Sequence, residues 1–466
     1  MGGEKIYKDF AEFLPPGTQV VYLLLFRLFG LCNWIPNLVA ILVGLISTWL
    51  VAFVSRKVIR TSPFLALLPG FLLLTYHYLG EIHRWLSSAA VFGALAVLME
   101  ERSRGRVIWS GVLCGLASFF TQTQGIFAVA GLLTFLFWES HQDRKLRQRL
   151  LSRAAWLVVA FIATVLTTCA YFIWRAGMSS FLDNLVTFPL FYHPLDRENF
   201  GLGIYFAEFP SLVPLSDLPH HAFSVLIHIL VPFIYIVFLA AYRRWNLKTE
   251  ESIRLMLINI VGLFLFASVA PAATYFRLFT VSAPALIILC YCLRGERWLS
   301  RLTTGLLLIA GLYALACPPM QVQMSSMSVL QLPRGPIAFA ESESVDRDAL
   351  AWLTLHTKRG DIFFVGDGKG LFFPTTLRPK DKTVGYDNTG QTRAKDVQDA
   401  IETLRNYRVK FIQWPPESCP PRFYDPGEDH LQPLSEYVQM NYHFVKQFNG
   451  PGNSDAGPIG IWQRNE

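Results

Sequence analysis

The chain has 466 residues, of which 52% are hydrophobic and 16% charged, and its formal net charge is +7. Soluble domains carry about 25% charged residues, so this composition excludes an ordinary cytosolic enzyme, and the apolar content excludes a disordered chain. Residues 318–466 carry 16 basic and 18 acidic side chains, which leaves 25 basic and 16 acidic side chains in residues 1–317. A basic excess between apolar stretches indicates a membrane partner and not nucleic acid.

The first elements lie in residues 1–34, which contain no stretch long enough to cross a bilayer. Segment 18–30 is apolar but short and carries an arginine, so we expect an interfacial or re-entrant helix there. Asp9 and Glu12 precede this helix, just before a Pro-Pro-Gly sequence. A carboxylate held at the membrane surface can act as general base toward a sugar hydroxyl or bind a divalent metal. The alternative is an exposed charged lead-in to a proline-capped helix.

Ten further stretches are apolar enough to be membrane-spanning helices, although several of them are short. They are 35–54, 63–79, 84–99, 106–120, 124–138, 155–174, 222–241, 255–271, 278–293 and 302–317. One long bent helix over 106–138 is an alternative to two separate spans.

The charges of the connecting loops predict the orientation of these spans. One set of alternate loops carries 18 basic residues, and the other set carries 4. The positive-inside rule places the first set in the cytoplasm. Residues 1–34, the loop 175–221 and everything after residue 318 are therefore expected to face outward. Because this orientation starts the chain outside without a helix to carry it across, we expect an upstream helix to be missing; the alternative is a short tail translocated by the first span.

After residue 318 the pattern changes to that of an α/β domain. Apolar and alternating runs predict strands at 361–367, 409–414, 442–448 and 459–464. Helical spacing predicts helices at 346–357, 394–407 and 433–441. The predicted fold is thus an α-helical multi-pass membrane protein with a C-terminal extracytoplasmic α/β domain. Its expected parts are an outer loop with a juxtamembrane helix (1–34), a transmembrane domain (35–317) and the α/β domain (318–466).

A polar cluster lies on the short outer turn between the second and third predicted spans. It contains His77, Glu81, His83 and Arg84. His77 and Glu81 share a face if the turn is helical, and Arg84 offers charge-assisted hydrogen bonds. The cluster therefore suits a divalent metal, with His77, Glu81 and His83 as ligands, or a phosphate. The alternative is a polar collar that anchors the helix ends.

Two further outward features are candidates for ligand contacts. Arg277 lies at the outer end of a predicted span, where a guanidinium either binds a lipid phosphate or extends to the interface. The loop 188–210 mixes aromatic and acidic residues that suit sugar binding, although packing on the bilayer surface is favoured. Walker A, GxSxG, HExxH and GxGxxG motifs are absent, so no nucleotide cofactor is expected.

Three segments, in this order and topology, resemble the GT-C superfamily of polyprenyl-phosphate-dependent glycosyltransferases. The likeness is to its family-39-like bacterial members, of the aminoarabinose transferase and protein mannosyltransferase type. The segments are GEKIYKDFAEFLPPGTQVVYLLLFRLFG (3–30), SGVLCGLASFFTQTQGIF (110–127) and YFRLFTVSAPALIIL (275–289). The resemblance covers most of residues 3–295, and no single motif is diagnostic.

The resemblance implies an enzyme of the cell (inner) membrane that moves a sugar from a polyprenyl-phosphate donor to a lipid, glycan or protein acceptor. It implies catalytic roles among Asp9, Glu12 and Glu81, donor-phosphate contacts from Arg84 and Arg277, and the loss of the family's first transmembrane helix and first acidic motif. We expect membrane lipids as partners and no nucleic acid. The rival hypotheses are a non-catalytic membrane partner or scaffold of this fold and, less favoured, a transporter for lipid-linked glycans.

Overall fold

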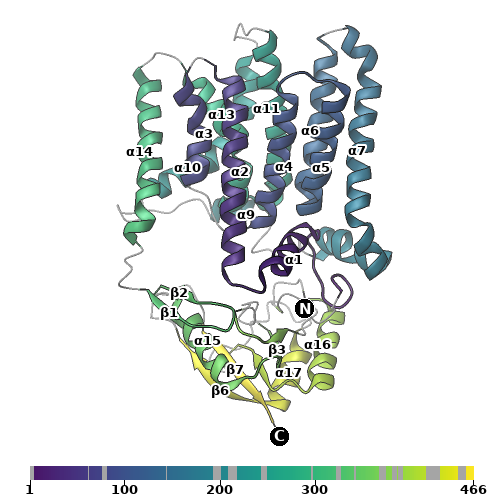
Figure 1. Cartoon of the computed structure of the whole chain (residues 1–466), viewed down its shortest axis with the longest axis vertical. Helices are drawn as coiled ribbons and strands as arrows, with labels where there is room; N and C mark the ends of the chain where they lie inside the picture. The colour runs from purple at the N-terminus through teal and green to yellow at the C-terminus, as the bar shows by residue number, and fades with distance from the viewer. Residues whose placement is uncertain are drawn as a thin grey trace.

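A computed structural model of the chain shows a helical bundle followed by a small sheet region (Figure 1). The residues described are 5–60, 62–75, 81–142, 144–192, 201–207, 218–242, 249–294, 298–321, 327–340, 343–366, 374–379, 386, 392–415, 431–449, 458–465.

The bundle is built from helices that follow the apolar stretches of the sequence. In chain order they are α1 (Gly17–Phe29), α2 (Trp34–Val58), α3 (Pro63–Thr75), α4 (Ile82–Leu98), α5 (Arg104–Phe120), α6 (Gln122–Ser140), α7 (Arg144–Ala176), α8 (Met178–Leu182), the π-helix η1 (Asp183–Tyr192), α9 (Leu202–Ala207), α10 (Leu218–Tyr242), α11 (Thr249–Val269), the 3-10 helix η4 (Ala270–Ala272), α12 (Tyr275–Thr280), α13 (Ala283–Cys292) and α14 (Trp298–Gln321).

Within the described part of the chain, four helical stretches are long and apolar enough to cross a membrane. They are Trp34–Val58, Lys145–Ala176, Ala222–Tyr242 and Glu250–Ala272. Most of the other predicted spans coincide with helices that are shorter, such as α3 and α4. The described part of the chain is therefore mostly helical with four candidate membrane spans, and a helix covers most of segment 18–30, as predicted.

The two separate spans predicted at 106–120 and 124–138 are both helices, whereas the span predicted at 278–293 differs from the helices observed. The 106–138 region forms two helices, because Thr121 adopts an extended backbone (φ −146°, ψ 106°) between α5 and α6. The prediction of a single helix over 278–293 is wrong, since α12 ends at Thr280 and α13 begins at Ala283. Pro284 lies in the first turn of α13, where its missing N–H costs no hydrogen bond, so it favours a new helix start.

Helices α5 and α7 approach each other closely at two glycines of α5. A Cβ placed on Gly111 would lie 2.5 Å from the carbonyl oxygen of Leu157, and one on Gly115 would lie 2.6 Å from Cβ of Thr164. The four-residue spacing puts both glycines on one face of α5. The two helices therefore approach more closely than any larger side chain would allow.

The C-terminal region contains two sheets. Strands β1 (Ser328–Leu330) and β2 (Ile337–Phe339) form an antiparallel pair. The five-stranded sheet has the order β4-β3-β5-β7-β6, made by β3 (Ile362–Val365), β4 (Arg378–Pro379), β5 (Phe411–Gln413), β6 (Tyr442–Phe448) and β7 (Ile459–Arg464). Strand β3 is parallel to β4 and β5, whereas β7 is antiparallel to β5 and β6.

Helices cover both faces of this sheet. Phe363 and Val365 point to one face and pack with α15 (Ser344–His356), while Phe364 between them points to the other. That second face packs against α16 (Ala394–Tyr407) and α17 (Gln432–Asn441). The four predicted strands and three predicted helices of this region are confirmed, whereas the short strands β1, β2 and β4 escaped prediction.

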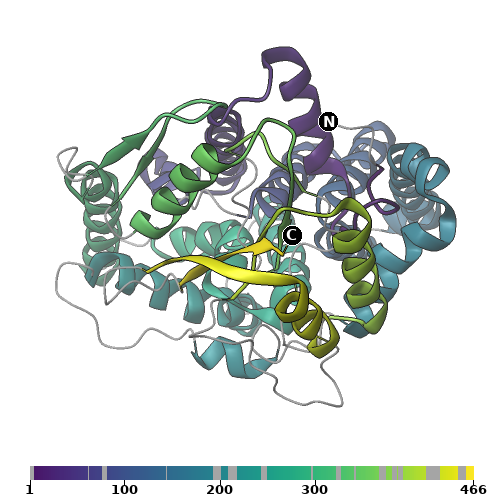
Figure 2. The ribbon, with the colours of Figure 1, turned by 90° about the horizontal axis from the view of Figure 1, so that it is seen from below.

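The sheet region and α1 lie at the same end of the bundle, as the view from below also shows (Figures 1 and 2). Asn33 Nδ2 donates a 2.9 Å hydrogen bond to the carbonyl oxygen of Gly335. Arg393, just before α16, donates a 3.0 Å bond to the carboxylate of Asp183 in η1. These contacts hold the sheet region against the helix ends where the candidate site lies.

Candidate active site

The N-terminal segment 5–16 is fixed over the helix ends by a buried tyrosine. Tyr7 is 2% exposed and packs edge-on against Phe172 of α7 and Phe181, which follows it in α8. Its hydroxyl donates a 2.7 Å hydrogen bond to the carbonyl oxygen of Leu14. Burial raises the pKa of this hydroxyl, so it stays protonated and remains a donor.

Glu12 follows on this segment and is held by three hydrogen bonds. Its Oε2 accepts a 3.0 Å bond from Gln19 Nε2 of α1, and its Oε1 accepts a 3.1 Å bond from the backbone N–H of Leu14. Its own backbone N–H donates to Oδ1 of Asn184 in η1, at 3.2 Å. Burial raises the pKa of Glu12 above its ordinary value, and the bonds from Leu14 and Gln19 offset part of that shift.

Asp9 has a different environment, although it stands only three residues away. It is exposed, and its carboxylate accepts a 2.7 Å bond from the backbone N–H of Lys5, which closes a turn. The structure thus places Asp9 on the solvent side of the segment and leaves Glu12 half-buried. Of the two carboxylates, Glu12 has the environment of a functional group, and a catalytic role for Asp9 stays a prediction.

The second acidic cluster lies at the start of α4. Glu81 precedes the helix in a left-handed backbone conformation (φ 54°), which is uncommon for a residue other than glycine. Its Oε2 accepts a 2.7 Å bond from Arg84 Nε and lies 3.4 Å from Nε2 of His83. His77, the remaining member of the predicted cluster, lies outside the described residues.

Opposing electrostatic effects separate the pKa values in this cluster. Burial alone would raise the pKa of Glu81, but the positive charge of Arg84, with smaller effects of His83 and Arg277, holds it below its ordinary value. Burial and Arg84 lower the pKa of His83 to about 4, although Glu81 acts in the opposite direction. At neutral pH, Glu81 is therefore ionised and His83 is neutral.

Arg277 is brought to the same cluster by α12. Thr274 caps the N-terminus of α12, because its Oγ1 accepts from the backbone N–H of Arg277. At the other end of the helix, Ser88 Oγ of α4 donates a 2.7 Å bond to the carbonyl oxygen of Thr280. The guanidinium donates a 3.0 Å bond to the carbonyl oxygen of Ala272. Its charge acts on both Glu81 and His83.

The described part of this cluster fits an anion better than a divalent metal. Hard divalent cations need several oxygen ligands, but Arg84 already occupies Oε2 of Glu81, and Arg277 adds a second positive charge nearby. Among the residues the structure describes, no three His, Cys, Asp or Glu side chains gather as a metal site. The positive charges of Arg84 and Arg277 therefore favour a negatively charged ligand over a metal ion at the described part of this cluster.

The junction between α5 and α6 joins the two acidic clusters. Thr121 Oγ1 donates a 3.1 Å bond to the carbonyl oxygen of His83, and Gln122 Nε2 donates a 3.3 Å bond to the carbonyl oxygen of Phe13. Two successive residues thus hold the backbone beside Glu81 and the backbone beside Glu12. Neither residue was predicted from the sequence, although polar side chains between two apolar stretches are a signal for such a role.

The remaining predicted contacts are described only in part. Residues 193–200 and 208–210 of the aromatic outer loop lie outside the described residues. Its first residues belong to η1, where Phe188 and Tyr192 lie beside the guanidinium of Arg393, with 5.4 Å from each ring centre to the cation. This part of the loop therefore contacts the sheet region.

No protein-family model matches the chain, and no similar sequence is found among curated proteins.

Proposed function

We propose that the chain is a membrane glycosyltransferase that moves a sugar from a polyprenyl-phosphate donor to an acceptor hydroxyl at the outer face of the cell membrane. The observation that supports this most is a pair of carboxylates whose pKa values are shifted in opposite directions. That of Glu12 is raised, and that of Glu81 is lowered beside Arg84. Such pairs are typical of active sites in which one carboxylate transfers a proton and the other stabilises charge.

In this proposal Glu12 is the general base. The acceptor oxygen forms a bond to the anomeric carbon while its proton passes to the Glu12 carboxylate and then to solvent. The bond between the anomeric carbon and the phosphate oxygen breaks, and polyprenyl phosphate leaves with the electron pair. A carboxylate whose pKa is raised toward neutral pH is a stronger proton acceptor, which favours Glu12 over the exposed Asp9.

Arg84 and Arg277 are proposed to bind the phosphate of the donor. Polyprenyl phosphate is a stable anion, so its departure needs nearby positive charge more than a proton. Glu81 is then a positioning residue, because its 2.7 Å bond orients the Arg84 guanidinium. The neutral His83 adds no competing charge at neutral pH.

The proposal includes ten membrane crossings, with the sheet region outside. The contrast between 18 and 4 basic residues in alternate loops supports this orientation. Both acidic clusters lie at the end of the bundle that also bears α1 and the sheet region. An outward site fits a lipid-carried sugar. Protease added outside right-side-out vesicles should therefore cleave the sheet region, and protection from that protease would contradict the orientation.

The activity is tested with the full chain in proteoliposomes. Polyprenyl-phosphate hexoses and pentoses, labelled in the sugar, are supplied with lipid, glycan and protein acceptors, and label transfer is measured. Glu12→Gln should lower the rate by about 10²–10⁴-fold, the usual contribution of a general base, and Arg84→Gln should also lower it. Glu101→Gln is the matched control, because Glu101 is exposed at the opposite end of α4.

Each outcome separates the candidates. Loss of transfer in Asp9→Asn with retention in Glu12→Gln would move the base to Asp9. Wild-type transfer by Glu12→Gln, Glu81→Gln and Arg84→Gln alike would remove both clusters from the site. An intact protein that transfers no label from any donor would favour the scaffold hypothesis.

A further inference from the structure

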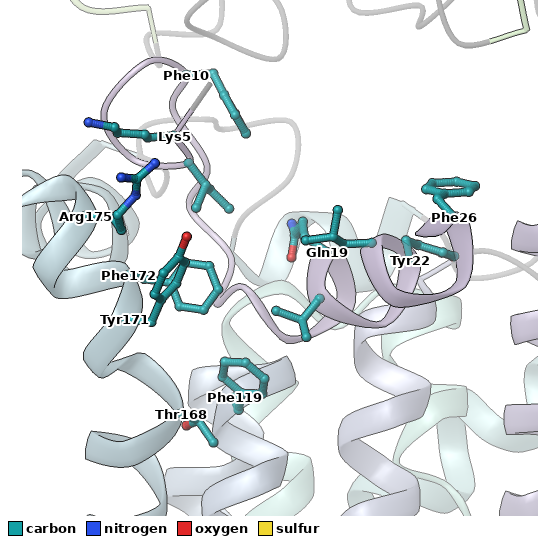
Figure 3. Close-up of a pocket in the computed structure, with 13 residues that line it drawn as sticks. Lys5, Phe10, Gln19, Tyr22, Phe26, Phe119, Thr168, Tyr171, Phe172 and Arg175 are labelled. Atoms are coloured by element: carbon teal, nitrogen blue, oxygen red, sulfur yellow. The ribbon is translucent and has the colours of Figure 1, made fainter. Parts of the chain in front are cut away.

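A cavity of about 690 Å³ lies between α1, the outer end of α7 and the N-terminal segment (Figure 3). This volume falls within the range of small-molecule sites, about 300–1,000 Å³. None of Glu81, His83, Arg84 and Arg277 lines it. The cavity is therefore separate from the arginines to which the donor phosphate was assigned.

The cavity walls are apolar and aromatic on the side toward the bundle. Tyr22, Leu23 and Phe26 of α1 face it, together with Phe119 of α5 and Phe172 of α7. Figure 3 shows α1 running across the ends of the bundle helices, so that its side chains cover the cavity from one side. Such a wall suits a hydrocarbon chain, because each buried CH₂ group contributes about 0.8 kcal/mol in an apolar environment.

Two cations stand at the other side of the cavity. Figure 3 shows Lys5 and Arg175 close to each other, beyond the rings of Tyr171 and Phe172. Within the described residues, neither the Lys5 ammonium nor the Arg175 guanidinium forms an ion pair. Two unpaired cations at the mouth of an apolar cavity are complementary to an anionic head group attached to a hydrocarbon chain.

The surroundings place this mouth at the level of lipid head groups. Tyr171 is 58% exposed and Trp174 is 77% exposed on the last turns of α7, next to Arg175. Tyrosine and tryptophan on helix ends are typical of the membrane–water interface. Leu24 and Leu28, on α1, are also exposed, as expected for a helix lying in that interface.

We propose that this cavity binds an anionic glycerophospholipid of the bilayer. Its phosphate contacts Arg175 and Lys5, and one acyl chain lies against Tyr22, Phe26 and Phe119. The bound lipid also touches Gln19, which lines the cavity and donates to the Glu12 carboxylate. The site is independent of the proposed transfer reaction and exists whether or not the chain is an enzyme.

The test is native mass spectrometry of the full chain in detergent, titrated with phosphatidylglycerol or phosphatidylcholine. Phosphatidylglycerol should bind the wild type at least about tenfold more tightly than phosphatidylcholine does. The double variant Lys5→Gln/Arg175→Gln should bind phosphatidylglycerol at least about tenfold more weakly than the wild type, the effect of removing a charge-assisted hydrogen bond. Thr168→Trp, which fills the cavity and leaves both charges, should weaken binding of both lipids. Arg56→Gln/Arg60→Gln removes two exposed charges at the opposite end and should bind as the wild type does.

The proposal is overturned if the two lipids bind equally, or if neither the charge variant nor Thr168→Trp weakens binding. Competition by inorganic phosphate alone as strong as that by phosphatidylglycerol would show an anion site without a lipid chain, and would also overturn it. Displacement of phosphatidylglycerol by equimolar polyprenyl phosphate would reassign the cavity to the donor. Melting temperatures of all variants confirm that losses of binding are not losses of fold.

Discussion

A close contact between α1 and α5 predicts the effect of a single methyl group. Gly17 is buried in the first turn of α1, and a Cβ at this position would lie 2.5 Å from the backbone oxygen of Phe119 and 2.7 Å from a ring carbon of Phe120. Separations under 3.0 Å are essentially never found for real Cβ atoms. In Gly17→Ala, α1 must therefore move away from α5 by at least 0.5 Å.

This displacement has an expected energetic cost. Overpacking of a well-packed contact costs about 1–3 kcal/mol, and the clash is with backbone, which cannot rotate away. Because 1.4 kcal/mol corresponds to a factor of ten, local opening of α1 should increase by about 5–150-fold. Gln19, which donates a hydrogen bond to the Glu12 carboxylate, lies on α1 and would move with it. The Gly17→Ala variant should therefore also lower any activity that depends on Glu12.

Hydrogen–deuterium exchange of the full chain in detergent measures this opening in peptides that cover residues 13–26. Gly105→Ala is the matched control, because Gly105 also lies in the first turn of a helix and its Cβ would meet nothing within 4 Å. Exchange in Gly17→Ala that equals the wild type, or an equal increase in Gly105→Ala, would refute the reasoning from backbone contact.

Three further predictions follow from the described contacts. The pKa of His83 is lowered to about 4 in the folded protein, from an ordinary 6.5. As the pH drops from 6.5 toward 4, the imidazole is therefore protonated in the unfolded chain but not in the folded one, and the free energy of unfolding falls. Melting curves of His83→Asn should lack this part of the pH dependence. Gly111→Val should separate α5 from α7 and cost about 1–3 kcal/mol, seen as a lower aggregation temperature in detergent. Arg393→Gln breaks the bond to Asp183 and should raise the protease sensitivity of the sheet region. Its control is Arg347→Gln, which removes an exposed ion pair with Asp348 worth about 0–1 kcal/mol and should change the protease sensitivity little.

Local patterns predicted the C-terminal elements well because each strand and helix is specified by its own neighbours in sequence. The alternation in 442–448 and the 3.6-residue spacing in 394–407 are periodic signals that survive in the structure. The helix break before Ala283 was missed because an apolar stretch shows no period of its own. Ser282 at the N-cap position and Pro284 in the first turn mark the new start there, and their effect on the backbone is local.

The candidate site was only partly predictable for a different physical reason. The charged residues around Glu81 are neighbours in sequence, so their cluster could be found directly. The environment of Glu12 depends on Asn184 and Gln122, which lie more than 100 positions away. No local pattern carries such a contact, so the sequence could not distinguish the half-buried Glu12 from the exposed Asp9.

The long separation between Glu12 and Asn184 also fixes the order in which the site can form during synthesis. Asn184 is made 172 residues after Glu12, an interval of about 10–35 s at 5–20 residues per second. Throughout that time the backbone N–H of Glu12 lacks this partner, although Gln122, made 109 residues after Phe13, is already available to bond to the Phe13 carbonyl oxygen. The contact of Arg393 with Asp183 closes 210 residues later still. The contacts of segment 5–16 are thus complete only after η1 has been made, and a chain stalled before η1 lacks the bond between Glu12 and Asn184.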